Sequence, residues 1–161
     1  MKYLAALALT AVFLASCGGG EKAKKRDFVT ENIEFAHVQI GKEIDVIEES
    51  RKALNPTTLK ADGSVYYCDY TDWRSGFFPG SVWYLYELTG DEALLPLARK
   101  YTEAIEAAKD LTWHHDVGFM FYCSFGNGLR LTGDPAYKEV IIQAAKSLST
   151  RFRPVAGIIQ S

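Results

Sequence analysis

The sequence predicts an all-α protein in which helical hairpins repeat, either as an open array or as a closed toroid. Three observations predict this fold: apolar residues recur at helical spacing, one turn sequence occurs twice, and nearly apolar segments alternate with amphipathic ones. No alternating pattern of useful length indicates β-strands. Without the first 16 residues, which read as a signal peptide, 161 − 16 = 145 residues remain, enough for the core of one ordinary domain.

Three amphipathic helices are expected because apolar residues recur in steps of three and four. They span about residues 27–54, 91–110 and 134–152. The residues predicted to point inward are Val29, Ile33, Ala36, Ile40, Ile44 and Ile47, then Leu94, Leu97, Ala98, Tyr101, Ile105 and Ala108, then Tyr137, Val140, Ile141, Ala144, Ala145, Leu148 and Phe152.

One turn sequence occurs twice, 43 residues apart, as LTGDEA from Leu88 and as LTGDPA from Leu131. Glycine readily ends a helix in the left-handed conformation, and aspartate is a preferred N-cap. Pro135 would occupy the first helical position, where its missing N–H costs nothing. The repeat therefore predicts two hairpins that share one kind of turn.

Two segments, residues 77–88 and 117–131, carry one charge each and are apolar almost all round. Helices of this composition are buried on most sides. Each begins near a glycine, and a third such helix is expected to begin at Gly157-Ile158-Ile159. In a toroid these helices form the inner ring, and the loops that enter them meet at one mouth.

The loops that enter the two buried segments carry the residues best suited to chemistry. These are Asp69, Asp72 and Trp73 before the first, and His114, His115 and Asp116 before the second. Carboxylates among aromatic side chains are typical of a sugar site, where flat rings stack on the apolar face of a pyranose. Asp116 has an alternative role as the N-cap of its helix. A metal site is not expected, because adjacent histidines point apart and no third ligand has a zinc spacing.

Residues outside these two loops are expected to have structural roles. Trp83 is expected in the core, and Arg151 and Arg153 are expected to interact with the end of their helix. Cys68 and Cys123 lie among aromatic residues, and the sequence leaves open whether they form a disulfide.

The N-terminus predicts a secreted lipoprotein. Residues 1–16 read as a signal peptide, with Lys2 followed by an apolar run too short to be a permanent membrane span. The tetrad LASC that ends at Cys17 resembles a bacterial lipobox, in which the cysteine is lipidated. Residues 17–26 would then tether the protein to a membrane. Gly18 after the cysteine favours the outer membrane of a Gram-negative cell, facing the periplasm or the cell surface.

Three blocks together resemble the unsaturated glucuronyl hydrolases of glycoside hydrolase family 88. They are DWRSGFFPG from Asp72, HHDVGF from His114, and RFR with AGIIQ from Arg151. The resemblance runs from about residue 27 to the end. It implies that residues 27–161 are the truncated N-terminal part of an (α/α)6 catalytic domain, about half of a ring.

The resemblance implies a glycosidase that removes 4,5-unsaturated uronic acid from the non-reducing end of polysaccharide-lyase products, chiefly of glycosaminoglycan type. An acid protonates C4, water adds at C5, and the resulting hemiketal falls apart. Asp116 matches the first of two aspartates, and the second, the main general acid/base, is expected beyond Ser161. We therefore expect this chain to be inactive and poorly folded by itself.

The resemblance also suggests residues that bind the sugar. His115 would hydrogen-bond it, and Phe78, at a position that is tryptophan in some relatives, would stack on the uronic ring. Trp73 and Gln160 are further candidates.

Other functions stay open. One is an unsaturated rhamnogalacturonyl hydrolase on the same fold, another a sugar-binding lipoprotein without catalysis, and a third a purely structural helical array. No cofactor is expected, and the net charge of −2 argues against nucleic acid as a partner.

Overall fold

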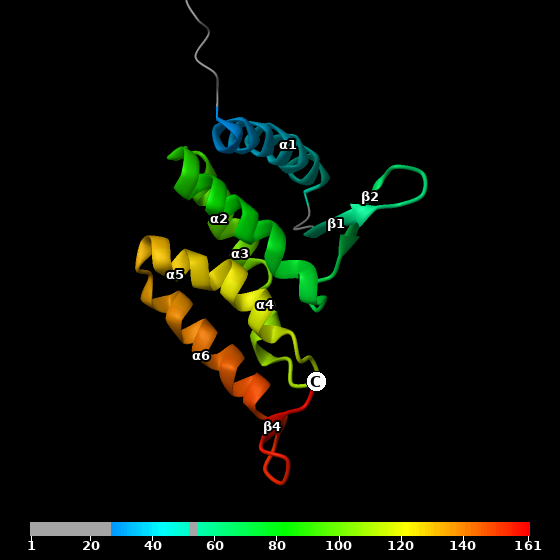
Figure 1. Cartoon of the computed structure of the whole chain (residues 1–161), viewed down its shortest axis with the longest axis vertical. Coiled ribbons are helices and arrows are strands. Elements are labelled where there is room, and N and C mark those ends of the chain that lie inside the picture. Colours follow the sequence, from blue (N-terminus) through cyan, green and yellow to red (C-terminus); the bar gives the residue numbers. More distant parts are fainter. Residues whose placement is uncertain (1–26, 52–54) are drawn as a thin grey trace, which may run out of the picture.

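A computed structural model describes residues 27–51 and 55–161, so the predicted signal peptide, Cys17 and tether lie outside the described residues. The described part is mainly helical (Figure 1). The helices are α1 (Phe28–Ser50), α2 (Phe77–Thr89), α3 (Leu94–Glu103), α4 (Val117–Phe121), α5 (Asn127–Thr132) and α6 (Pro135–Ser149). Short 3-10 helices occupy Trp73–Gly76 and Glu106–Asp110, and the strands are β1 (Asn55–Leu59), β2 (Val65–Cys68), β3 (Phe152–Arg153) and β4 (Ile158–Ile159).

Helix α1 confirms the first amphipathic prediction. It begins at Phe28 because the Asp27 carboxylate accepts the backbone N–H of Thr30 at 2.8 Å, an N-cap that satisfies a free helix donor. It ends where Arg51 adopts a left-handed conformation, with φ of 55°. Only Ile44 and Ile47 of the predicted inward stripe are fully buried.

The repeated turn has the predicted glycine geometry in both hairpins, but the predicted aspartate N-cap is found only in the second. In the first, the Asp91 carboxylate accepts the N–H of Ala93 at 3.0 Å, and α3 begins at Leu94 with Ala93 as its N-cap. Gly90 ends α2 with φ of 67°, and Gly133 ends α5 with φ of 69°. The Asp134 carboxylate accepts the N–H of Ala136 at 3.0 Å, and Pro135 occupies the first turn of α6. These local interactions fix the chain reversals α2–α3 and α5–α6.

The second buried segment is one continuous helical run from Val117 to Thr132. Between α4 and α5, residues Tyr122–Gly126 form a π-helical turn. Such turns are rare and are often found at functional sites.

Two glycines, Gly76 directly before α2 and Gly80 within it, let this part of the chain approach the helical run from Val117 to Thr132 closely. A Cβ on Gly76 would lie 2.2 Å from the carbonyl oxygen of Met120, and one on Gly80 would lie 2.7 Å from that of Cys123. Only glycine permits such contact between backbones. The first turn of each buried segment is therefore held against the other.

The core lies between the buried helices and the amphipathic ones. Trp83 is fully buried, as predicted, and its Nε1–H donates to Thr102 Oγ1 at 2.8 Å. Phe125 packs edge-on against Tyr137, with ring centroids 5.1 Å apart. The predicted alternation of buried and amphipathic helices is confirmed.

Two β-hairpins correct the prediction that strands are absent. Strands β1 and β2 pair antiparallel around a turn in which Gly63 has φ of 82°. Strands β3 and β4 pair Phe152 with Ile159, and Gly157 turns the chain with φ of 68°. The helix predicted to begin at Gly157 is therefore wrong, because Ile158 and Ile159 pair with a strand.

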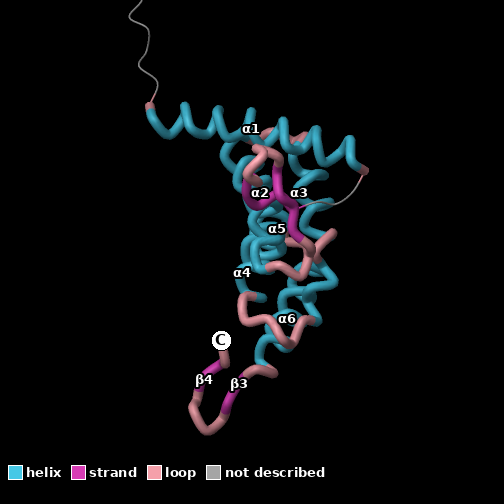
Figure 2. The backbone as a smooth tube through the Cα atoms, turned by 90° about the vertical axis from the view of Figure 1, so that its right-hand side faces the viewer, coloured by secondary structure: helices cyan, strands magenta, loops and turns pink. Residues whose placement is uncertain are grey.

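The helices form an open row rather than a closed ring. From top to bottom in Figure 1 the order is α1, α2, the α4–α5 run and α6, with the β3–β4 hairpin beyond α6. Figure 2 shows α1 crossing one end of this stack, with that hairpin at the other end. Among the described helices, none is both long and apolar enough to cross a membrane.

Candidate functional site

The two predicted loops meet at one place. Trp73 begins the 3-10 helix before α2, and Phe119 lies in the first turn of α4. Their ring centroids are 6.2 Å apart, and the intervening backbones touch at Gly76 and Met120. The two loops therefore lie close together, as a common mouth would require, and the mouth itself stays a prediction.

Asp116 lies at the junction between the histidine loop and α4. Its carboxylate Oδ2 is 3.1 Å from His115 Nε2 and 4.0 Å from His114 Nδ1. The side chain is 22% exposed, so it is sheltered but reachable. It makes no capping hydrogen bond to the helix that follows. Asp116 therefore occupies the N-cap position, but its carboxylate pairs with His115 and does not cap the helix.

An open pocket of about 420 Å³ adjoins this carboxylate. It combines an apolar wall with His115 and Asp116 as polar groups, which is the usual character of a ligand site. The lining residues are His115, Asp116, Gly118, Phe119, Tyr122, Cys123 and Leu148.

An exposed aromatic cluster lies beside the carboxylate. Trp73, Phe77 and Phe119 meet edge-to-face, with centroid separations of 5.5 to 6.3 Å. All three rings are partly open to solvent, at 41%, 38% and 53%. Edge-to-face packing stabilises such clusters and leaves ring faces available. Trp73, a predicted sugar-binding residue, is therefore partly exposed and lies against the first turn of α4.

Phe78 does not join this cluster. Its side chain is buried and packs against Tyr101, with ring centroids 5.0 Å apart. The structure thus places Phe77, not Phe78, at the surface. A helix that is apolar on all sides gives no sign in its sequence of which of the two rings is buried.

The loop carboxylates before α2 have structural partners. Asp72 accepts hydrogen bonds from Arg74 Nε at 2.9 Å and Nη2 at 2.8 Å, and these bonds lower the pKa of Asp72. The Arg74 guanidinium also lies over the Tyr66 ring, 5.9 Å from its centroid. Asp69 accepts the N–H of Thr71 at 2.9 Å, as in an Asx turn.

Gln160 lies in the β3–β4 hairpin and not in the pocket lining. Its side-chain oxygen accepts Arg153 Nε at 2.8 Å. Arg151 donates to the Gln160 carbonyl at 2.9 Å and to the Trp113 carbonyl at 2.6 Å. The prediction that the two arginine side chains bind the end of their helix is therefore wrong. Arg151 joins this hairpin to the histidine loop, and Arg153 binds Gln160 within the hairpin.

Neither metal ligation nor a disulfide is seen in the described residues. They contain no group of three or more histidine, cysteine, aspartate or glutamate side chains that could hold a metal ion. Cys68 and Cys123 are free thiols. Burial raises the pKa of Cys68 to about 11, so this thiol is not a reactive nucleophile.

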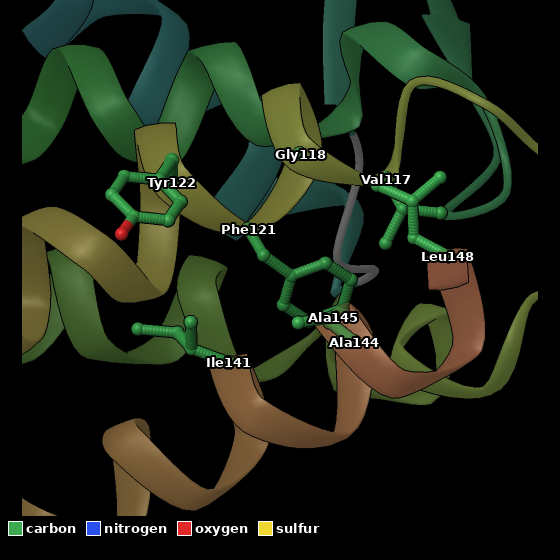
Figure 3. Close-up of a pocket in the computed structure, with 8 residues that line it drawn as sticks. All are labelled: Val117, Gly118, Phe121, Tyr122, Ile141, Ala144, Ala145 and Leu148. Atoms are coloured by element: carbon green, nitrogen blue, oxygen red, sulfur yellow. The ribbon is translucent and has the colours of Figure 1, made fainter. Parts of the chain in front are cut away.

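A second, smaller pocket is almost wholly apolar. It has a volume of about 130 Å³ and lies between α6 and the α4–π segment (Figure 3). Phe121 points towards α6, and Ile141, Ala144 and Ala145 face it from that helix. This pocket contains no charged side chain, whereas the pocket at Asp116 does.

The sequence reasoning missed Phe77, Phe119 and Tyr122 as surface residues of this site. Phe119 and Tyr122 are 53% and 72% exposed and line the Asp116 pocket. Their spacing of three after Asp116 and after each other was an available signal, because such residues share one face of a helix.

No protein-family model matches the chain. An unsaturated glucuronyl hydrolase of Formosa agariphila is 46% identical over 91 residues, covering 56% of this chain and 23% of the relative. An unsaturated chondroitin disaccharide hydrolase of Streptococcus pyogenes is 28% identical over 150 residues, covering 88% and 36%.

A solved structure agrees with these relatives. The crystal structure of an unsaturated glucuronyl hydrolase specific for heparin matches with a TM-score of 0.74 and 34% identity, covering 83% of this chain and 35% of that one. The likeness confirms the all-α, (α/α)6 prediction for the part present. The chain spans only 23% to 38% of the curated relatives it matches. In sequence and in fold, the chain is related to about a third of an unsaturated glucuronyl hydrolase.

Proposed function

We propose that the protein containing this chain is a family 88 glycoside hydrolase that removes 4,5-unsaturated uronic acid from the non-reducing end of lyase-generated oligosaccharides. One observation carries the proposal. The sheltered Asp116 carboxylate, uncommitted to capping, faces a pocket beside an exposed aromatic cluster. The relatives named above act, by their names, on glucuronyl or chondroitin disaccharide substrates.

The chemistry requires a carboxylate pair. An acid delivers a proton to C4 while the oxygen of water bonds to C5, and the remaining proton of water returns to the carboxylate. The C5 hemiketal then opens to a ketone and leaves the former ring oxygen as a hydroxyl on C1. This C1 hemiacetal collapses to an aldehyde as its hydroxyl proton passes to the aglycone, which leaves as an alcohol, so one water is consumed in total. Protonation of carbon near neutral pH needs an acid whose pKa is raised by burial or by a neighbouring carboxylate. We assign Asp116 as one member of this pair.

His115 and the aromatic cluster would hold the sugar. His115 is 48% exposed, lies 3.1 Å from Asp116 and can donate to a sugar hydroxyl from the same pocket. Trp73 and Phe119 offer apolar ring faces for stacking. Phe77 replaces Phe78 in this proposal, because only Phe77 reaches the surface.

The cell location is part of the same proposal. A lipid on Cys17 would anchor the protein to the outer membrane, next to polysaccharide fragments. Metabolic labelling with palmitate tests this: the wild type should be labelled and Cys17→Ala should not, whereas equal labelling of both would exclude Cys17 as the anchor.

Substrate consumption tests the activity. The full-length protein is incubated with unsaturated chondroitin, heparin and rhamnogalacturonan disaccharides, and the ultraviolet absorbance of the C4–C5 double bond is followed. Loss of absorbance with a glycosaminoglycan disaccharide supports the proposal. Loss only with the rhamnogalacturonan disaccharide would move the protein to pectin fragments, and no loss at all would favour a sugar-binding protein.

A further inference from the structure

The two adjacent histidines have different surroundings. His115 is 48% exposed and lines the Asp116 pocket, whereas His114 is 12% exposed and does not line it. His114 is instead folded back on its own loop, where its Nδ1 accepts the backbone N–H of Asp116 at 3.0 Å. The motif therefore contains one histidine that faces the ligand side and one that faces the backbone.

This hydrogen bond fixes the protonation of the His114 ring. An N–H can donate only to a nitrogen that carries a lone pair, so Nδ1 is unprotonated and the neutral ring carries its hydrogen on Nε2. A proton on Nδ1 would remove the acceptor and would be drawn to Asp116 Oδ2, 4.0 Å away. The carboxylates that interact electrostatically with the ring are those of Asp72 and of Asp116 itself.

The bond also sets the backbone at Asp116. This residue has φ of −91° and ψ of 16°, in the sparsely populated bridge region where active-site residues are often found. In a common turn, an Asn or Asp side chain accepts the N–H two residues later. Here His114 Nδ1 fills that position, so the hydrogen bond holds the backbone from which the Asp116 side chain extends to the pocket.

The loop is held on its other side as well. The His114 ring lies between Trp113 and His115, with centroids 5.1 and 5.7 Å away, and Arg151 binds the Trp113 carbonyl. We propose that His114 is a positioning residue: by accepting the Asp116 N–H at Nδ1, it orients the Asp116 carboxylate for the reaction. This inference rests on the proposed function of Asp116.

Two variants of His114 give the test. Asparagine places Oδ1 the same number of bonds from the backbone as Nδ1, so His114→Asn keeps an acceptor for the Asp116 N–H. Glutamine moves its amide one bond further out, so His114→Gln does not. In the full-length protein we expect His114→Asn to keep turnover within about threefold, and His114→Gln to lose about 100-fold, as a misplacement of about 1 Å can cause. Equal turnover of the two variants, high or low, would overturn the inference.

A spectroscopic measurement on the wild-type protein does not depend on turnover. Long-range nitrogen–proton correlation spectra of the full-length protein report which ring nitrogen of each histidine is protonated, and the missing signal in His114→Asn identifies His114. We expect the hydrogen on Nε2, and a hydrogen on Nδ1 would contradict the inference.

Failure of the inference and failure of the proposed function are distinguishable. If Asp116→Asn keeps wild-type turnover, the proposed function fails, while the His114 signature should persist because residue 116 still has its backbone N–H. If Asp116→Asn is inactive and the two His114 variants behave alike, only the positioning role fails.

Discussion

The contact between Gly76 and the α4 backbone allows a quantitative prediction for Gly76→Ala. The added Cβ would lie 2.2 Å from the Met120 carbonyl oxygen and 2.7 Å from the Met120 Cα. Ordinary contacts begin near 3.4 Å, so the two segments must separate by more than 1 Å. Overpacking costs about 1–3 kcal/mol, and the upper end is expected because the obstacle is helical backbone that cannot rotate away.

Gly41→Ala is the matched control. Gly41 lies inside α1, and an added Cβ there would meet no heavy atom within 4 Å. Alanine in a helix interior is about 0.5–1 kcal/mol more favourable than glycine, so this variant should be slightly more stable than the wild type.

Urea unfolding of the full-length variants, followed by circular dichroism, measures the difference. With an m-value of about 2 kcal/mol/M, a loss of about 3 kcal/mol lowers the midpoint by about 1.5 M. Separation of Trp73 from Phe119 should also raise the KM for the disaccharide. A Gly76→Ala midpoint equal to that of Gly41→Ala would refute the close approach that joins the two loops.

Three further predictions concern the core, the site loop and the buried thiol. Trp83→Phe removes the donor to Thr102 and leaves a buried hydroxyl without its partner, so the free energy of unfolding should fall by about 1–3 kcal/mol, measured in urea; an unchanged value would contradict the hydrogen bond. Arg74 lowers the pKa of Asp72 in the folded protein below its value in the unfolded chain. The Asp72 carboxylate therefore stabilises the fold fully at a pH above the ordinary aspartate pKa of about 3.9, and this stabilisation is lost as the pH falls through the pKa of Asp72 in the folded protein. Asp72→Asn should therefore weaken the loss of stability below about pH 4, and urea midpoints that fall as steeply as in the wild type would exclude this contribution. Cys68, with its pKa raised to about 11, should resist iodoacetamide at pH 8 until the protein unfolds; rapid labelling of the native protein, detected by mass spectrometry, would show that the thiol is not buried.

Features set by local interactions were predictable from the sequence. The turns at Gly90 and Gly133 depend on the conformational freedom of glycine and on a capping aspartate, both of which can be read from a few residues. The alternation of apolar and amphipathic helices was predictable for a similar reason, because burial follows composition along each helix.

Features set by contacts between distant segments were not predicted. Phe77 and Phe78 are chemically alike, and only the packing of α2 against Met120 and Tyr101 decides which ring is buried. The β1–β2 hairpin was missed although Asp62-Gly63 is a recognised turn signal. The π-helical turn has no sequence signature.

The geometry of the histidine loop could be predicted only in part. The motif drew attention to Asp116, but only the structure shows that its carboxylate makes no capping bond and that His114 holds its backbone.

Turnover by Asp116→Asn is the measurement that tests the central claim most directly. Full-length wild type and variant are compared on the preferred unsaturated disaccharide by the absorbance of its double bond, with unfolding midpoints measured in parallel. We predict that turnover falls by about 100- to 10,000-fold while the midpoint stays unchanged, because the substitution removes a proton-transfer group and no structural cap. Turnover close to that of the wild type would contradict the assignment of Asp116 to the reaction.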